Sequence, residues 1–256
     1  MEKRTFGATE IGGKGLTAAV LALGEHLLSP RRCLVCGRSL QGAIFDLPEV
    51  PVLCERCEAA LPRIEGELCS RCGAPLVSEI DLCMVCRDRQ SSLETLRALY
   101  AYREGAVSLI HALKEAGEPR VARYLADEIL RRRILSSETS LIVPIPPSRP
   151  GKRRRGFDQS RLLARALSQR TGLPRNALLS RRRGGAQKEL DREGRLSNVA
   201  SQLRLVSGAF RLETPPPAEV TLLDDVVTTG ATLEAAAALL KGSGVERVRA
   251  VVIARD

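Results

Sequence analysis

The chain has 256 residues, enough for one large domain or for a medium-sized domain joined to a small module. It carries a net charge of +10, and no stretch approaches the roughly 20 apolar residues of a membrane-spanning helix. This composition excludes an integral membrane helix and favours a cytoplasmic protein without a membrane partner. Tryptophan is absent and aromatic residues make up 3%, so the core must be built from Leu, Val, Ile and Ala.

The positive charge is concentrated in one segment. Residues 149–183 contain twelve Arg or Lys and a single acid, Asp158, so this segment carries more than the net charge of the whole chain. Such a segment favours a polyanionic partner: phosphate groups on a small molecule, nucleic acid or, less favourably, anionic lipid. A solvated arginine-rich surface is the alternative.

The N-terminal segment is predicted to be an amphipathic helix within residues 1–30. Its apolar stretch, LTAAVLALGEHLL at 16–28, follows basic residues as in a signal peptide, but Glu25 and His26 interrupt it. No small-residue cleavage site follows. A helix that packs on the next module is therefore the preferred interpretation.

The cysteines predict two structural zinc ions. Four Cys-x-x-Cys pairs contain all eight cysteines of the chain: Cys33 and Cys36, Cys54 and Cys57, Cys69 and Cys72, and Cys83 and Cys86. A two-residue spacer lets one tight turn present two sulfurs to one tetrahedral ion. A disulfide framework is disfavoured because adjacent Cys-x-x-Cys pairs are poor cross-links, and a redox motif accounts for one pair only.

Spacing alone leaves open which cysteines share an ion. Sequential pairing joins the first two pairs at one ion and the last two at the other, whereas a cross-braced arrangement has the same spacing. A module spanning residues 31–90 buries little apolar area. Zinc binding, on the order of 10–16 kcal/mol per site, would therefore supply its folding energy.

Strand and helix patterns alternate after the cysteines. Strands are predicted by apolar and β-branched content, and helices by apolar residues at three- and four-residue spacing. The expected strands are 96–102, 140–147, 220–225 and 245–255, and the expected helices are 106–117, 120–135, 159–172 and 231–244. This order predicts an α/β domain over residues 91–256 with a mostly parallel sheet, which binds ligands beyond the carboxyl ends of its strands.

The segment VTLLDDVVTTGATLEAAAALL, residues 220–240, has the pattern of a phosphate cradle between a strand and a helix. Helix N-terminal N–H groups attract an anion, and the hydroxyls of Thr228, Thr229 and Thr232 add donors. Asp224 and Asp225 would accept hydrogen bonds from vicinal hydroxyls or hold Mg²⁺. A ligand whose vicinal hydroxyls and phosphate group lie this close together fits the description of a ribose 5-phosphate.

Two other interpretations of this segment are weaker. A Walker B strand requires a G-x-x-x-x-G-K-[ST] partner, which neither GGKG at 12–15 nor PGKR at 150–153 provides. A solvated Asp-Asp turn that caps a helix is disfavoured because the acids directly follow a buried run.

These motifs resemble a known family. LLDDVVTTGAT closely resembles the phosphoribosyl-pyrophosphate (PRPP) loop of type I phosphoribosyltransferases. The cysteine module, HALKEAG and VPIPPSRPGKRRRGFDQS together resemble the ComF/GntX family, from about Cys33 to the C-terminus. The resemblance implies an α/β fold: a type I phosphoribosyltransferase-like parallel sheet flanked by helices, behind an N-terminal double zinc ribbon.

The resemblance also implies roles for individual residues. Asp224 and Asp225 would hold the ribose hydroxyls, 114–117 would meet pyrophosphate, and 152–160 would form a mobile hood. Mg²⁺ would accompany PRPP, and the candidate catalytic residues are Lys114, Arg153 and Arg155. The implied PRPP-binding residues are Asp224, Asp225, Val226, Val227, Thr228, Thr229, Gly230, Ala231, Thr232, Lys114 and Gln159.

This sequence departs from the family pattern at three places. Glu115 replaces an aromatic residue, Asp158 replaces an amide in the hood, and the segment between Gln187 and Phe210 is longer than usual. Two additional acids near a polyphosphate site are expected to weaken binding.

The implied function is a PRPP-binding protein of the phosphoribosyltransferase family that takes part in DNA uptake during natural competence. Its implied partners are PRPP or another phosphoribosyl ligand, single-stranded DNA and a competence helicase. The alternative is an active phosphoribosyltransferase of nucleotide metabolism with an unidentified acceptor base. The sequence leaves turnover of PRPP open.

Overall fold

The computed structural model describes residues 32–40, 52–78, 80–115, 117–147, 156–181, 203–208, 210 and 215–256. The chain divides into two compact units, Met1–Ala59 and Ala60–Asp256. The helix expected within residues 1–30, and Arg153 and Arg155 of the hood, lie outside the described residues. Across the described ranges, no helix is long and apolar enough to cross a membrane.

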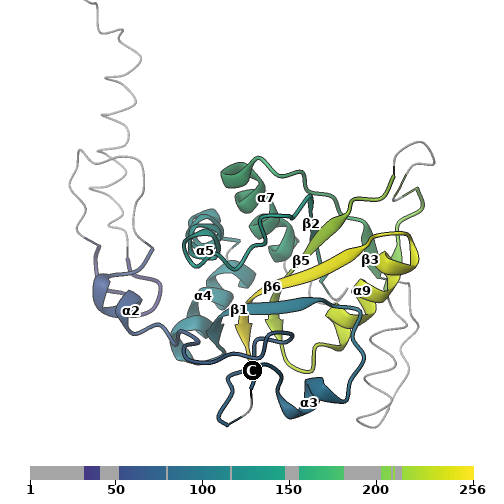
Figure 1. The fold of residues 1–256 in the computed structure, drawn as a ribbon. Coiled ribbons are helices and arrows are strands. Elements are labelled where there is room, and N and C mark those ends of the chain that lie inside the picture. The colour runs from purple at the N-terminus through teal and green to yellow at the C-terminus, as the bar shows by residue number, and fades with distance from the viewer. Residues whose placement is uncertain are drawn as a thin grey trace, which may run out of the picture. The chain divides into compact units, whose positions relative to one another are not determined.

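The larger unit is built on a four-stranded parallel sheet in the order β1-β6-β5-β2 (Figure 1). The strands are β1 (Thr95–Ala101), β2 (Leu141–Pro144), β5 (Glu219–Val227) and β6 (Arg247–Arg255), and all three pairings are parallel. The predicted parallel α/β sheet is confirmed. The carboxyl ends of these strands lie at one edge, where ligand sites are expected.

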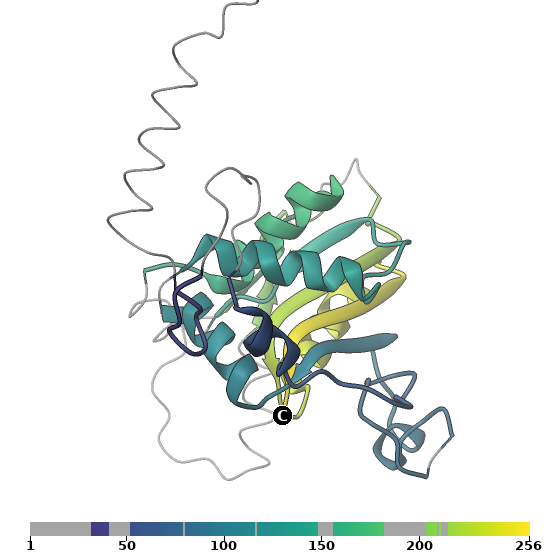
Figure 2. The same cartoon turned by 90° about the vertical axis from the view of Figure 1, so that its left-hand side faces the viewer.

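Helices cover both faces of the sheet, as a fully parallel sheet requires. Helices α4 (Glu104–Glu115), α5 (Pro119–Arg131) and α7 (Gln159–Thr171) lie on one face, and α9 (Ala231–Gly242) lies on the other (Figures 1 and 2). Val220 and Leu222 of β5 pack with Leu233 of α9, while Leu223 points to the opposite face and is also fully buried. The sheet is therefore anchored on both sides.

The ends of the elements follow local chemistry. β2, at the edge of the sheet, ends at Pro144, which has no backbone N–H to donate, and α7 is capped by Gly172, whose φ of 74° is the left-handed conformation that terminates helices. β5 extends beyond the predicted 220–225 and ends at Val227, so both acids lie inside a hydrogen-bonded strand. In the register with β6, Asp224 lies opposite Val252.

Several short elements were not predicted. An antiparallel pair joins β3 (Leu179–Arg181) to β4 (Leu203–Leu205), and α3 (Met84–Arg87) carries Cys86 and has Cys83 as its N-cap. In the smaller unit, α2 (Glu55–Ala59) follows Cys54. Elements of three to five residues are too short to show a periodic pattern in a sequence.

Candidate functional site

The centre of the site is Asp225, near the carboxyl end of β5. Its carboxylate is 8% exposed and accepts a hydrogen bond from the Gln159 amide at 2.7 Å on one oxygen. The Lys114 ammonium lies 3.2 Å from the other oxygen. The structure therefore brings together three residues that the sequence placed in one site, from β5, the first turn of α7 and the last turn of α4.

Asp224 differs electrostatically from its neighbour. Burial, followed by the negative charge of Asp225, raises the pKa of Asp224 to about 8. Lys114 and Arg181 act in the opposite direction, as does the backbone N–H of Asp225, which lies 2.9 Å from an Asp224 oxygen. With the pKa above its ordinary value, this group's contribution to stability decreases as pH rises from about 4 to 8. A hydroxyl donor or a cation from a ligand would relieve this cost.

Arg181 is a residue of the site that the sequence analysis did not single out. It lies on β3, its Nε donates to the carbonyl of Pro146 at 2.9 Å, and it interacts electrostatically with Asp224. Burial lowers the pKa of the Arg181 guanidinium, and the charge of Asp224 opposes that shift. The sequence showed Arg181 only as one member of the basic segment, without a sign that it faces the acids.

The loop after β5 has the predicted form of an anion cradle. Gly230 is the N-cap of α9 with a φ of 76°, a conformation that favours glycine, and Thr228 and Thr229 before it are exposed. The first N–H groups of a helix have no partner within the helix and therefore face an incoming anion. Val227 is only 4% exposed and packs in the core, so it anchors the start of this loop.

The end of α4 and the start of α7 meet through Gly117 and Phe157. Gly117 has a φ of +59°, and a Cβ there would lie 3.0 Å from the Phe157 ring, so the ring requires glycine at this position. Asp158 is the N-cap of α7, where its side chain accepts a hydrogen bond from the backbone N–H of Arg161. The acid that departs from the family pattern therefore stabilises the helix that carries Gln159.

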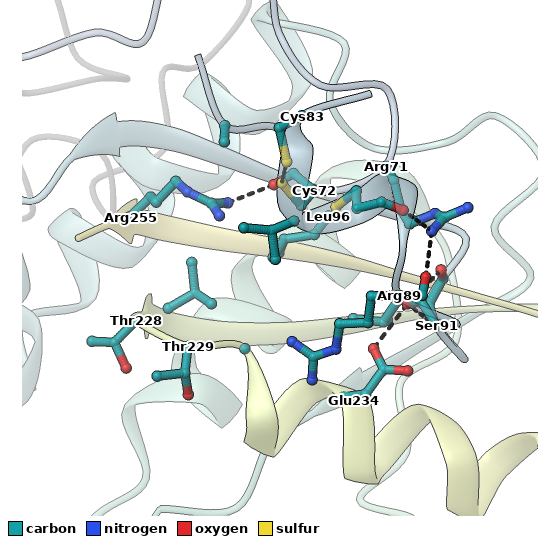
Figure 3. A pocket seen from close by; sticks show the side chains of 16 residues that line it. Arg71, Cys72, Cys83, Arg89, Ser91, Leu96, Thr228, Thr229, Glu234 and Arg255 are labelled. Carbon is teal, nitrogen blue, oxygen red and sulfur yellow. Dashed lines mark hydrogen bonds between the residues drawn. The ribbon is translucent and has the colours of Figure 1, made fainter. Parts of the chain in front are cut away.

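A pocket of about 400 Å³ lies beside the loop that follows β5 (Figure 3). Thr228, Thr229 and Gly230 form one wall, and Arg71 and Arg89 of the cysteine module, with Ser91 directly after it, form another. This pocket lies within the unit Ala60–Asp256. No sequence pattern predicts this pocket, because its two walls are more than 130 residues apart along the chain.

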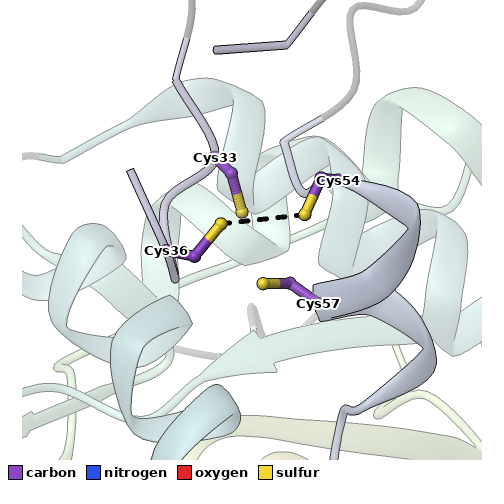
Figure 4. A group of neighbouring side chains, drawn as sticks. All are labelled: Cys33, Cys36, Cys54 and Cys57. Carbon is purple, nitrogen blue, oxygen red and sulfur yellow. Dashed lines mark hydrogen bonds between the residues drawn. The ribbon is translucent and has the colours of Figure 1, made fainter. Parts of the chain in front are cut away.

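The eight cysteines form two clusters in sequential order: Cys33, Cys36, Cys54 and Cys57, and Cys69, Cys72, Cys83 and Cys86. Within each cluster the sulfurs lie within 4.8 Å of one another (Figure 4 shows the first cluster). The Cys36 and Cys54 sulfurs are 3.7 Å apart, and those of Cys72 and Cys83 are 3.8 Å apart. Tetrahedral Zn–S bonds of about 2.3 Å place sulfurs about 3.8 Å apart, so both clusters fit zinc.

The first pair of each cluster forms the same tight turn. The N–H of Gly37 donates to the Cys33 carbonyl at 2.8 Å, and the N–H of Gly73 donates to the Cys69 carbonyl at 2.9 Å. Burial raises the pKa of the Cys33 and Cys69 thiols, but backbone N–H donors outweigh it and lower each to about 6. Both turns therefore favour the thiolate, the form that binds a metal.

The comparisons with known proteins agree with this geometry. Residues 25–89 match the family described as a double zinc ribbon domain, and residues 158–256 match the phosphoribosyl transferase domain. The chain is a double zinc ribbon joined to a phosphoribosyl transferase domain. The first match covers both cysteine clusters, and the second covers the acid pair, the loop after it and Gln159.

Curated relatives are similar to this two-part chain over most of its length. Competence protein F of Haemophilus influenzae is 28% identical, covering 88% of this chain and 96% of the relative. Competence protein ComFC of Bacillus subtilis is 26% identical, covering 83% of this chain and 89% of the relative. DNA utilization protein YhgH of Escherichia coli K12 is 29% identical, covering 79% of this chain and 90% of the relative. The resemblance to the ComF family predicted from the sequence is confirmed.

Proposed function

We propose that the phosphoribosyl transferase domain binds PRPP, together with Mg²⁺, at the carboxyl end of β5. The observation that carries this proposal is the position of Asp225, between Lys114 at 3.2 Å and Gln159 at 2.7 Å. Five residues later, the chain reaches the Gly230 cap of α9. Acceptors for vicinal hydroxyls thus lie one short loop away from donors for a phosphate.

In this proposal, different residues of the chain bind different parts of PRPP. Asp224 and Asp225 accept hydrogen bonds from the ribose hydroxyls, and the backbone and hydroxyls of 228–232 hold the 5-phosphate. Lys114 exchanges its contact with Asp225 for the pyrophosphate, which Arg153 and Arg155 of the hood would cover. Mg²⁺, when bound, supplies additional positive charge for the pyrophosphate.

The charge balance supports an incoming cation or hydroxyl donor. Burial, followed by the charge of Asp225, raises the pKa of Asp224, so ionising both carboxyl groups is costly in the unliganded chain. A ligand that donates hydrogen bonds or brings Mg²⁺ favours the ionised form. PRPP binding should therefore release protons near neutral pH.

For the cellular role, we propose DNA handling during uptake in natural competence, in the cytoplasm. The names of the relatives, competence protein F, ComFC and DNA utilization protein, support this role over ordinary nucleotide metabolism. The basic segment 149–183 supports single-stranded DNA as the partner because each neutralised phosphate adds binding energy. The zinc ribbons would serve as a docking platform for a competence helicase.

The deciding experiment measures PRPP binding and turnover separately. Calorimetry with Mg²⁺-PRPP tests binding to the zinc-loaded chain, and pyrophosphate release is then followed across a panel of nucleobases. Asp225→Asn should weaken PRPP binding by at least about tenfold, because a hydrogen bond to a charged group contributes about 1.5–3 kcal/mol. Arg123→Ala, an exposed change on α5, serves as the control. No heat of binding with the wild-type chain would reject the proposal.

Release of pyrophosphate with one base would make the protein a transferase and identify its acceptor. Binding without release would leave a ligand-binding DNA-handling protein on a transferase fold. For the DNA role, single-stranded DNA binding should weaken steeply with salt. Arg153→Ala and Arg155→Ala should each reduce the salt slope by about 0.7. An unchanged slope in both variants would exclude the hood from DNA binding.

A further inference from the structure

The pocket beside the loop after β5 is not explained by PRPP binding. Its walls contain Thr228, Thr229 and Gly230 of the proposed phosphate loop, but none of Asp225, Lys114 or Gln159. Its volume of about 400 Å³ lies in the range of small-molecule sites. The apolar residues Leu93, Leu96 and Val227 line it, together with Cys72, Cys83 and Cys86 of the second cysteine cluster.

The frame of the pocket is held in place by hydrogen bonds between distant segments. The Arg71 guanidinium donates to the carbonyls of Cys86 at 2.6 Å and Arg89 at 2.7 Å. Ser91 donates through its hydroxyl to the Glu234 carboxylate of α9 at 2.9 Å. Two walls, one from the zinc module and one from α9, are thus fixed relative to each other. A rigid frame lowers the entropic cost of binding a ligand.

Arg89 gives the pocket a cation directed toward the phosphate loop. The residue is exposed, and Figure 3 draws its guanidinium between the side chains of Thr229 and Glu234. A planar guanidinium is suited to stack on an aromatic ring and to pair with a phosphate. Nucleobases that carry a phosphate combine both features.

The position of the pocket determines how such a base would be attached. On a ribose 5-phosphate, the 5-phosphate and the anomeric carbon lie at opposite ends of the sugar. An acceptor base joins at the anomeric carbon, whereas this pocket adjoins the loop that would hold the 5-phosphate. A group bound here is therefore attached through that phosphate.

We infer that this pocket binds a second nucleoside, joined through the 5-phosphate of the ribose held by the domain. The phosphate then bridges the two sites, as a phosphodiester in a nucleic acid strand or as a diphosphate in a dinucleotide. The inference rests on the proposed function, since the loop at 228–232 must hold the bridging phosphate. The inferred ligands carry a second nucleoside on the 5-phosphate, whereas the 5-phosphate of PRPP is terminal.

The experiment compares three ligands by calorimetry on the full zinc-loaded chain: ribose 5-phosphate, ADP-ribose and the dinucleotide ApA. At least one of the longer ligands should bind about tenfold more tightly than ribose 5-phosphate, since one stacked base contributes about 1–3 kcal/mol. Preference for ADP-ribose indicates the diphosphate linker, and preference for ApA indicates the strand.

Two variants test whether the pocket provides the gain. Val85→Trp fills the pocket from an exposed position, and Arg89→Glu reverses its charge. In each variant, the affinity for the preferred longer ligand should fall to about the affinity for ribose 5-phosphate. Arg123→Glu on α5 should keep the wild-type ratio of these two affinities. Zinc content confirms that each variant is folded.

Two results would overturn the inference alone: longer ligands that bind no more tightly than ribose 5-phosphate, or a gain that survives both pocket variants. If the wild-type chain binds neither PRPP nor ribose 5-phosphate, the proposed function fails, and this inference fails with it.

Discussion

The two cysteine clusters have the same ligands and the same local geometry, but they belong to different units of the chain. Gly37 and Gly73 follow the first pair in each cluster with φ values of +69° and +68°. Each turn lowers the pKa of its first thiol to about 6. The first cluster belongs to the unit Met1–Ala59, and the second belongs to the unit that contains the sheet.

The attachment of the second cluster can be followed residue by residue. The Leu96 N–H of β1 donates to the Arg71 carbonyl at 2.7 Å, and Arg255 at the end of β6 donates to the Cys72 carbonyl. A Cβ on Gly73 would lie 2.6 Å from the Leu96 carbonyl oxygen, whereas a Cβ on Gly37 meets no atom within 4 Å. The Cys-x-x-Cys pattern therefore specifies the metal site, and the residues around it specify what the metal stabilises.

The largest expected effect comes from removing one ligand of each cluster. Cys69→Ser should lower the free energy of unfolding of the larger unit by about 4 kcal/mol, because loss of a metal is among the few single changes this costly. Cys33→Ser should change that quantity by less than about 0.5 kcal/mol. Amide hydrogen exchange in β1 and β6 measures both.

Each variant should lose one zinc ion of two, which elemental analysis checks. Equal effects of the two variants on exchange in β1 and β6 would remove the distinction between the clusters.

The second prediction exchanges the two glycines for alanine. Both changes place a side chain in the left-handed region, at a cost of about 1–2 kcal/mol. Gly73→Ala adds a collision with the Leu96 carbonyl, so its total cost should reach about 3 kcal/mol, against about 1 kcal/mol for Gly37→Ala. Thermal unfolding of the zinc-loaded variants, followed by circular dichroism, provides the measurement. A larger loss for Gly37→Ala would contradict the proposed role of the Gly73 contact.

These contrasts also show what the sequence could predict. The turn at Cys69 to Gly73, the strand before Asp224 and the helix after Gly230 each depend on neighbouring residues, so short-range patterns were sufficient to predict them. Asp225, Lys114 and Gln159 were assigned to one site only through the family resemblance, and their direct contacts were not predicted, because these residues come from three separate elements.

The remaining features depend on contacts between distant segments. Arg181 approaches Asp224 only because β3 lies beside the carboxyl end of the sheet, and Ser91 meets Glu234 across 143 residues. No periodicity or motif encodes such contacts. The choice between sequential and cross-braced zinc sites was open for the same reason: spacing along the chain is identical in both, and only the fold distinguishes them.

The smallest expected difference concerns two arginines that donate to carbonyls of equivalent turns. Arg97 of β1 donates to the Ser70 carbonyl at 2.7 Å and is half-buried, and burial lowers the pKa of its guanidinium. Arg32 donates to the Gly37 carbonyl at 3.2 Å from an exposed position.

Arg97→Ala should destabilise the larger unit by about 2 kcal/mol, since hydrogen bonds to charged groups contribute about 1.5–3 kcal/mol when shielded from water. Arg32→Ala should cost less than about 0.5 kcal/mol, as exposed substitutions do. Denaturant unfolding of both variants, compared at equal zinc loading, separates these values. If Arg97→Ala were as mild as Arg32→Ala, the second cluster would be held to the sheet by its backbone contacts and by Gly73 alone.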